Sequence, residues 1–175
     1  DALKDAGRTA DARAVYEALI LRPDPAEGSD VALAALSRMS GSGSQASYPY
    51  DRRLWAAYPT TVAGASASIR LQEYGPFPSW QETALRADRL MVSSQWTQAI
   101  DTVDLSNTPI PKDGSAQACM AQYAKGRSLF KLNRVTDASL VLGPGGRACK
   151  GSDDDRGAKS LYLAGKSLER KKAWA

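Results

Sequence analysis

Apolar positions recur along the second half of the chain at a spacing of 39 residues. In each copy a small residue is followed three residues later by a leucine: the pairs are Ala87 and Leu90, Gly126 and Leu129, and Gly165 and Leu168. Nine residues beyond the first two leucines stand Ala99 and Ala138. Self-similarity at a period of about 20 to 50 residues indicates a repeat architecture, in which each unit completes its neighbour's core.

The apolar positions within each segment predict helices and no strand. They fall three and four residues apart, which places one buried stripe on each helix. We expect about ten helices, counting the end of one within residues 1–6, and the Gly-rich stretch 143–147 (GPGGR) to end a helix at Leu142. The other expected helices are 10–21, 29–39, 51–58, 62–74, 79–92, 95–105, 115–132, 135–142 and 155–171.

This pattern resembles the tetratricopeptide repeat, whose alanine stands twelve residues after its small residue. The copies that start at Ala87 and Gly126 carry these marks, and an apolar residue stands four positions beyond each alanine, at Val103 and Leu142. The period exceeds the standard length of about 34 residues, so HEAT-type repeats stay an alternative. The resemblance implies an all-α, right-handed superhelix without a sheet, in which residues 1–175 form one repeat domain, degenerate over 25–78 and clearer over 79–175. We expect burial of Leu90, Ala99, Leu129, Ala138 and Leu168.

The charge is uneven along the chain, although its net value is only +4. Residues 1–111 hold 10 Lys and Arg against 13 Asp and Glu, and residues 112–175 hold 13 against 6. The balance therefore runs from −3 to +7, and a basic half can face an anionic partner. The alternative is an ordinary solvated helical surface. The candidate anion-binding residues are Lys125, Arg134, Arg147, Lys150, Lys171 and Lys172.

Catalytic chemistry has little support in the sequence. The chain has no histidine and only two cysteines, which removes serine–histidine and cysteine–histidine mechanisms and histidine-containing zinc sites. No phosphate-binding motif is present, because no Lys-Ser or Lys-Thr follows the glycines of 143–147. We therefore expect no cofactor, no metal and no catalytic residue within this segment.

The two cysteines are expected to meet at one end of a helical hairpin. Cys119 and Cys149 lie about equally far from the predicted turn near residue 134. Antiparallel arms of equal length bring both to the open end of the hairpin, where a disulfide indicates an oxidising compartment. The alternative is two small, buried, reduced cysteines.

Two further groups of residues have a structural and a functional interpretation. Tryptophans 55, 80, 96 and 174 suggest sugar stacking, but Trp96 and Trp174 share one repeat position, which favours packing. The acidic run 153–155 suggests calcium, but it lacks the alternating ligands of a calcium loop. Capping of the helix that follows is the simpler interpretation.

Two blocks of the sequence indicate which protein family the chain resembles. The phrase WAAYPTTVAGASASIRL, from Trp55, precedes a CMAQYAKGRSLFKLNRVTDASLVL block from Cys119 and AKSLYLAGKSLERKKAW from Ala158. Together they resemble the helical superhelix that precedes the catalytic domain of soluble lytic murein transglycosylases of Gram-negative bacteria. The resemblance covers most of residues 51–175, and GPGG departs from the family's continuous helix. That family cleaves peptidoglycan with a glutamate in a Glu-Ser motif, which none of the glutamates here possesses: Glu17, Glu27, Glu73, Glu82 and Glu169.

The resemblance implies a non-catalytic scaffold, cut from a longer chain, that positions peptidoglycan cleavage by an absent C-terminal domain. Its partners are then peptidoglycan, that domain or other envelope proteins, and its location is the periplasm or cell envelope. The alternatives are a tetratricopeptide adaptor that binds envelope proteins or peptides and, third, a cytosolic adaptor. We expect neither a nucleic-acid partner, since no helix face joins basic residues to stacking aromatics, nor a membrane span, since apolar runs are too short.

Overall fold

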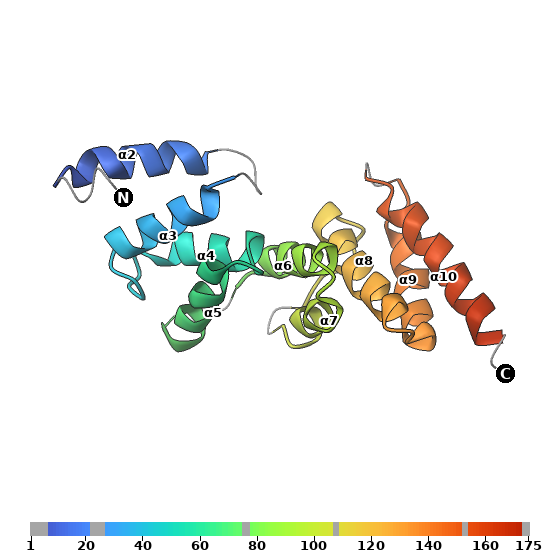
Figure 1. Cartoon of the computed structure of the whole chain (residues 1–175). Coiled ribbons are helices and arrows are strands. Elements are labelled where there is room, and N and C mark those ends of the chain that lie inside the picture. Colours follow the sequence, from blue (N-terminus) through green and yellow to red (C-terminus); the bar gives the residue numbers. More distant parts are fainter. Residues whose placement is uncertain (1–6, 22–26, 75–77, 107–108, 152–153, 173–175) are drawn as a thin grey trace. The chain divides into compact units, whose positions relative to one another are not determined.

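The computed structural model describes residues 7–21, 27–74, 78–106, 109–151 and 154–172. These residues form helices, and no strand occurs within these ranges, so the expected all-α class is confirmed (Figure 1). The helices are α2 (Thr9–Ile20), α3 (Ser29–Met39), α4 (Tyr48–Ala57), α5 (Val62–Tyr74), α6 (Trp80–Val92), α7 (Trp96–Asp104), α8 (Ala116–Lys131), α9 (Val135–Ala148) and α10 (Arg156–Lys172). The helix expected to end at residue 6 lies outside the described residues.

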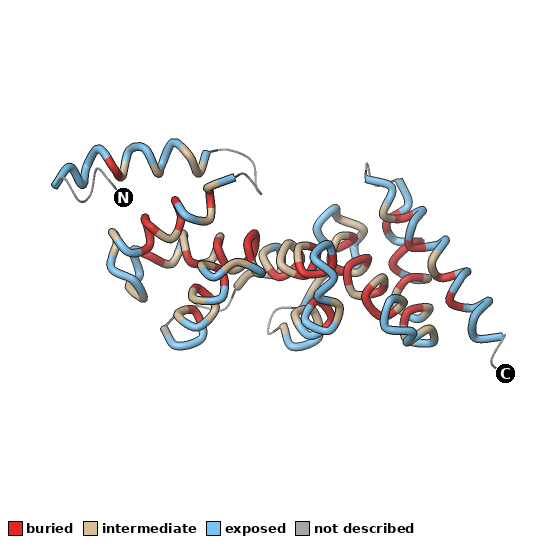
Figure 2. Tube along the Cα trace, in the orientation of Figure 1, coloured by how far each residue is buried: buried red, intermediate tan, exposed pale blue. Residues whose placement is uncertain are grey.

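The chain divides into two compact units, Asp1–Phe77 and Pro78–Ala175. In the first unit, α3 packs against α2, α4 and α5. In the second, α8 contacts α6, α7, α9 and α10, while α6 also packs on α7 and α9 on α10. Buried segments line the helix contacts inside each unit (Figure 2). The arrangement of residues 1–175 as one repeat domain stays a prediction.

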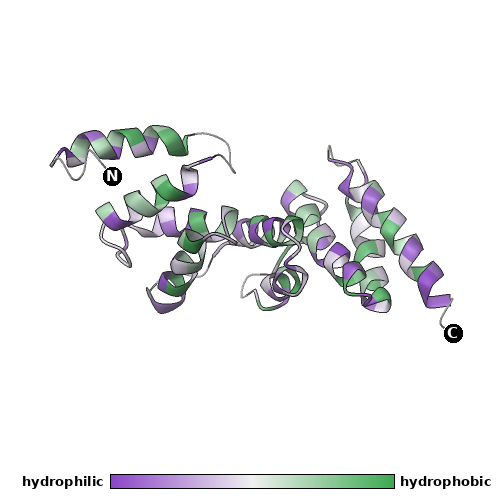
Figure 3. Cartoon of the chain, viewed as in Figure 1, coloured by the Kyte–Doolittle hydropathy of each residue, from purple (hydrophilic) through white to green (hydrophobic). Residues whose placement is uncertain are grey.

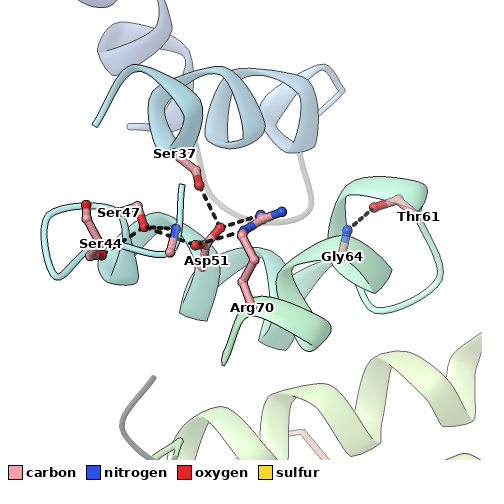
Figure 4. Close-up of polar contacts among 8 residues, drawn as sticks. Ser37, Ser44, Ser47, Asp51, Thr61, Gly64 and Arg70 are labelled. Atoms are coloured by element: carbon pink, nitrogen blue, oxygen red, sulfur yellow. Dashed lines mark hydrogen bonds and ion pairs between the residues drawn. The ribbon is translucent and has the colours of Figure 1, made fainter. Parts of the chain in front are cut away.

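The first unit is held by a buried polar network as well as by apolar packing (Figure 4). Asp51, at the start of α4, is fully buried. Its carboxylate accepts hydrogen bonds from the hydroxyls of Ser37 (2.8 Å) and Ser47 (3.2 Å). It also accepts two from the Arg70 guanidinium of α5, at 2.5 and 3.2 Å. One carboxylate therefore ties α3, α4 and α5 together.

The turns inside the two helix pairs of the second unit are built alike. Ser94 and Asn133, one repeat apart, both adopt the left-handed backbone conformation, with φ of 61° and 60°. The backbone amide of the residue that follows donates a hydrogen bond to the backbone carbonyl of the repeat leucine. Gln95 donates to Leu90 and Arg134 donates to Leu129, each with a nitrogen–oxygen distance of 2.9 Å. This pairing closes a helix end around a left-handed residue. The 39-residue period therefore extends from side chains to backbone hydrogen bonds.

The expected burial is confirmed at four of the five repeat positions. Leu90, Ala99, Leu129 and Ala138 are at most 1% exposed and belong to one core. The expectation for Leu168 is wrong, because its side chain is 51% exposed. Leu168 lies on α10, on a face that no helix of the described residues covers.

The glycine-rich stretch 143–147 lies inside a helix. α9 runs through Pro144 to Ala148, so the expected end at Leu142 is wrong. Proline in a helix interior removes a hydrogen bond and usually weakens or kinks the helix. Packing on both sides of α9 explains why the helix continues.

Gly145 and Gly146 lie where α9 comes closest to its neighbours. A Cβ atom on Gly145 would lie 2.5 Å from the Gln122 Oε1 of α8. One on Gly146 would lie 2.7 Å from Leu161 of α10. These glycines therefore permit close helix approach, which offsets their low helix propensity.

Candidate functional site

The clearest candidate site is a groove between α8 and α10, two helices that are equivalent in the repeat. Its volume is about 740 Å³, within the range of about 300–1,000 Å³ typical of ligand pockets. Both helices contribute aromatic and basic side chains to its walls. We call it the basic groove, and it is lined by Tyr123, Arg127, Phe130, Lys131, Asp155, Ala158, Lys159, Tyr162 and Leu163.

The aromatic rings of the groove carry cations on their faces. The Arg170 guanidinium lies 4.2 Å from the centre of the Phe130 ring, and that of Arg127 lies 5.9 Å from the Tyr123 ring. Such contacts stabilise by about 0.5–1 kcal/mol at exposed sites. They also hold long cationic side chains against the wall, so a ligand finds the charges already placed.

The charge of the groove is predominantly positive. Arg127 and Lys131 stand four residues apart on α8, so they share one face of that helix, and Lys159 faces the groove from α10. Asp155 is the only acidic side chain among the residues that line it in the described part of the chain. A groove of this composition favours carboxylate or phosphate groups on a ligand with some apolar surface.

The start of α10 is anchored to α6 by an ion pair. The Arg156 guanidinium donates to Asp88 Oδ1 at 3.2 Å, and it also pairs with Asp154. Asp88 is 7% exposed, and burial raises the pKa of its carboxyl, against the opposing effect of Arg156. The Arg156 backbone amide donates to Asp154 Oδ1 as well, which supports capping as the role of this acidic run.

The structure does not bring the six candidate anion-binding residues together. Lys125 pairs with Asp104, and Arg134 pairs with Asp137 at the turn between α8 and α9. The others follow the antiparallel course of the helices: Arg147 and Lys150 lie at the end of α9 remote from Arg134, and Lys171 and Lys172 lie in the last turn of α10. That last turn is strongly hydrophilic (Figure 3). Their binding of anions stays a prediction.

The residues of the basic groove were not identified from the sequence, and the premise that no helix face joins basic residues to aromatic ones is wrong for α8, where Arg127 and Lys131 line the groove with Phe130. A signal was present, because Arg127 and Lys166 are one repeat apart, as are Tyr123 and Tyr162. In both copies a basic residue follows the tyrosine by four positions, so the two lie on the same face of the first helix of the pair. Total charge alone could not separate this edge from the rest of the basic half.

The cysteines form a disulfide, as expected. Cys119 and Cys149 are bonded, with their Cα atoms 5.7 Å apart, at the open end of the α8–α9 hairpin. Both side chains are buried, at 1% and 3% exposure. The bond joins the start of α8 to the residue that follows α9, so it fixes the hairpin that forms one wall of the groove.

Other candidate chemistry finds little geometric support. Within the described ranges, no three His, Cys, Asp or Glu residues are grouped as metal ligands, while residue 153 of the acidic run lies outside them. Trp96 packs against the core of the second unit, consistent with a packing role, and Trp174 lies outside the described residues. None of the helices in the described part of the chain is both long and apolar enough to cross a bilayer.

A second cavity, of about 660 Å³, lies beside α7, α8 and α9. Its lining includes Val103, Ile110 and Leu140, together with the ion-paired side chains of Lys125 and Asp104. Because that pair neutralises its own charges, the cavity shows less preference for an ion than the basic groove.

Comparisons with family models, curated proteins and solved structures found no match to this chain. The functional argument therefore rests on its residues and their geometry.

Proposed function

We propose that this chain is a non-catalytic, tetratricopeptide-like scaffold of the cell envelope that positions peptidoglycan cleavage by a separate lytic transglycosylase domain. The proposal includes a right-handed superhelix built from the repeated helix pairs. The sequence resemblance over residues 51–175 supports the family, and the disulfide of Cys119 and Cys149 supports an oxidising compartment such as the periplasm.

The observation that carries the proposal is the basic groove between two equivalent helices. A repeat that places the first helices of successive pairs side by side presents a continuous surface, which suits binding rather than chemistry. The stem peptides of peptidoglycan carry carboxylates, and the side chains of Arg127, Lys131 and Lys159 provide opposite charge. The scaffold would then hold the cell-wall polymer while another domain cuts it.

The first test is co-sedimentation of the purified chain with isolated murein sacculi. We expect the chain to sediment with sacculi at low salt and to release no soluble muropeptides. The double charge reversal of Arg127 and Lys131 to Glu should lower the bound fraction several-fold, because it inverts the charge on the α8 wall. A parent protein that includes the catalytic domain should release anhydro-muropeptides from the same sacculi.

The matched control reverses two other exposed charges of the same unit. Lys112→Glu with Lys166→Glu changes the net charge by the same amount, at exposed positions that neither line the basic groove nor belong to the six candidate anion-binding residues. We expect this variant to sediment like the unmodified chain. Equal losses in both variants would mean that total charge, and not the groove, holds the sacculi.

The alternative is an adaptor that binds envelope proteins or peptides. The aromatic walls favour it, since Tyr123, Phe130 and Tyr162 offer apolar contact that a purely ionic surface lacks. A parent protein that leaves sacculi uncut, and captures a defined envelope protein through Arg127 and Lys131, would replace the scaffold proposal with this one.

A further inference from the structure

The cavity beside α7, α8 and α9 is a second candidate binding site, and all of its lining residues belong to the second unit. Its volume of about 660 Å³ lies within the range of about 300–1,000 Å³ typical of ligand pockets. We call it the aliphatic cavity. Its larger apolar side chains are those of Val103, Pro109, Ile110, Leu140, Val141 and Pro144. In the part of the chain that the structure describes, no residue lines both this cavity and the basic groove.

The walls of the aliphatic cavity are formed by helices and by the connector between α7 and α8. In the connector, Ile110 stands between Pro109 and Pro111. Each proline fixes its own φ and restricts the residue before it to extended backbone, so this part of the wall is stiff. On α9, Leu140 and Pro144 are four residues apart and share one face of the helix. The cavity thus lies between α7, α8 and α9, none of which is the last helix of the unit.

The apolar lining is open to solvent at Leu140, whose side chain is 69% exposed. Val103 and Val141 are partly buried and pack against the core of the second unit. A ligand that covers Leu140 and reaches these two valines removes apolar surface from water at the rim of the cavity and further inside it.

The composition of the lining favours an aliphatic ligand over an aromatic one. Among the described residues, no aromatic side chain lines this cavity, whereas tyrosine and phenylalanine rings line the basic groove. The cavity therefore offers no ring on which an aromatic ligand could stack. Branched aliphatic side chains and proline rings instead pack against a methylene chain through many small dispersion contacts.

The polar groups of the cavity suit a ligand with one anionic group. Lys125 pairs with Asp104, so these two charges offset each other. Lys112 also lines the cavity, and it takes part in no ion pair with the residues that the structure describes. The Gln122 amide lies close to the backbone before Lys112, because its Nε2 donates to the Pro111 carbonyl oxygen at 3.4 Å. One uncompensated cation therefore remains, near an amide that has a second N–H to donate.

We propose that the aliphatic cavity binds one molecule of a free fatty acid. The alkyl chain packs against Val103, Leu140 and Val141, and the carboxylate accepts hydrogen bonds from the Lys112 ammonium and the Gln122 amide. This inference goes beyond the proposed function and does not depend on it, because the cavity and the basic groove are lined by different residues.

Displacement of a fluorescent fatty acid, dansylaminoundecanoate, measures binding to the whole chain at concentrations below those that form micelles. We expect the probe to bind saturably at one site per chain, and decanoate to displace it. Affinity should rise from hexanoate to decanoate by up to about fourfold for each methylene, because each one adds buried apolar surface. This dependence on chain length distinguishes an apolar cavity from a site that recognises the carboxylate alone.

Two variants locate the two ends of the ligand. Leu140→Ser removes apolar lining and should weaken decanoate binding about five- to tenfold. Leu21→Ser, at an 85% exposed leucine outside the cavity, is its control. Lys112→Gln should weaken decanoate binding about two- to fivefold and leave binding of the neutral analogue decanol unchanged. Lys166→Gln, which removes a charge of α10, should change neither, and circular dichroism verifies that all four variants are folded.

The opposite results overturn the proposal. Absence of saturable displacement, or equal affinity of Leu140→Ser and the unmodified chain, would show that the cavity does not hold an alkyl chain. Equal binding of decanoate and decanol that Lys112→Gln leaves unchanged would reject recognition of a carboxylate. Flotation with phosphatidylglycerol vesicles provides the remaining arm. A chain that floats with vesicles and binds no free decanoate would have a membrane surface, and not a fatty acid, as its ligand.

Discussion

At the residue scale, Gly126 and Gly165 occupy one repeat position but have opposite surroundings. An added methyl group on Gly126 meets the buried Leu142, whereas one on Gly165 meets nothing. We expect Gly126→Ala to lower the free energy of unfolding by about 1–3 kcal/mol through overpacking. Gly165→Ala should raise it by about 0.5–1 kcal/mol, because alanine favours a helix interior. Urea denaturation measures both, and a change of the same sign in both variants would contradict the assigned contacts.

Asp51 is the most consequential polar residue of the first unit. Asp51→Ala removes the carboxylate that accepts four hydrogen bonds, so Arg70, Ser37 and Ser47 lose this acceptor. Breaking a buried ion pair typically costs about 3–5 kcal/mol, and we expect the lower end because the Arg70 side chain is 24% exposed. The same change at Asp11, in an exposed pair with Arg8, serves as control and should alter the unfolding midpoint little. Equal losses of stability in Asp51→Ala and Asp11→Ala would show that burial of the Asp51 ion pair does not determine its contribution.

The raised pKa of Asp88 predicts that the stability of the second unit depends on pH. Burial raises the pKa of the Asp88 carboxyl in the folded state above its ordinary value, so between the two pKa values the folded protein retains a proton that the unfolded chain loses. The contribution of Asp88 to stability therefore falls as pH rises from the unfolded pKa through the folded pKa, and is constant above it. The unmodified chain should lose stability relative to Asp88→Asn across this window. Carboxyl NMR measures the folded pKa directly, and a pKa lower in the folded protein than in the unfolded chain would reverse the sign.

The residue scale also shows where sequence reasoning succeeds. Ala99 and Ala138 were predicted correctly because a small residue in a strict repeat marks the closest helix contact. Leu168 was predicted wrongly by the same rule, since burial needs a partner that a repeat pattern does not itself supply. The role of Asp51 could not be predicted, because in the sequence an aspartate near the start of a helix is indistinguishable from an ordinary capping residue. Only the structure shows that side chains from three helices meet at its carboxylate.

At the element scale, the α8–α9 hairpin is fixed at both ends. The turn at Asn133 closes one end and the disulfide of Cys119 and Cys149 closes the other, across 30 residues of sequence. Closing a loop of this length stabilises a protein by about 3–4 kcal/mol in the chain-entropy model. The hairpin is therefore expected to resist local opening while oxidised.

Replacement of both cysteines by alanine tests this contribution. We expect the midpoint of chemical denaturation of the second unit to fall, by the equivalent of about 3 kcal/mol. Thiol titration of the unfolded, unreduced protein should find no free thiol. Two reactive thiols per chain would contradict the bond and the compartment inferred from it, and reduction of the unmodified chain should reproduce the effect of the double variant.

The helices themselves were largely predictable from the sequence. Periodicity located α3 and α5 at their observed bounds, and most other ends lie within a few residues of expectation. α9 is the exception, since a proline and glycines usually mark a helix end, and here tertiary contacts with α8 and α10 override that preference. The basic groove needed the structure, because it depends on which faces of α8 and α10 meet.

At the scale of the whole molecule, each unit contains the interactions that stabilise it. The second unit has a continuous core, the disulfide and the Asp88–Arg156 ion pair, which joins residues 68 positions apart. The first has the Asp51 network and its own buried leucines. Each set of contacts is complete within its unit, so neither unit depends on the other for the contacts described here.

We therefore expect residues 78–175, expressed alone under oxidising conditions, to fold without the first unit. Their apolar core and cross-link are what a domain of this size needs for independent stability. The fragment should show a helical circular dichroism spectrum and one cooperative thermal transition, and it should bind sacculi as the whole chain does. A fragment carrying Ala138→Leu is the control and should melt lower, because it overpacks a position with no exposed surface. If residues 78–175 are unfolded alone, the first unit supplies part of their stability, and the two units form one cooperative structure.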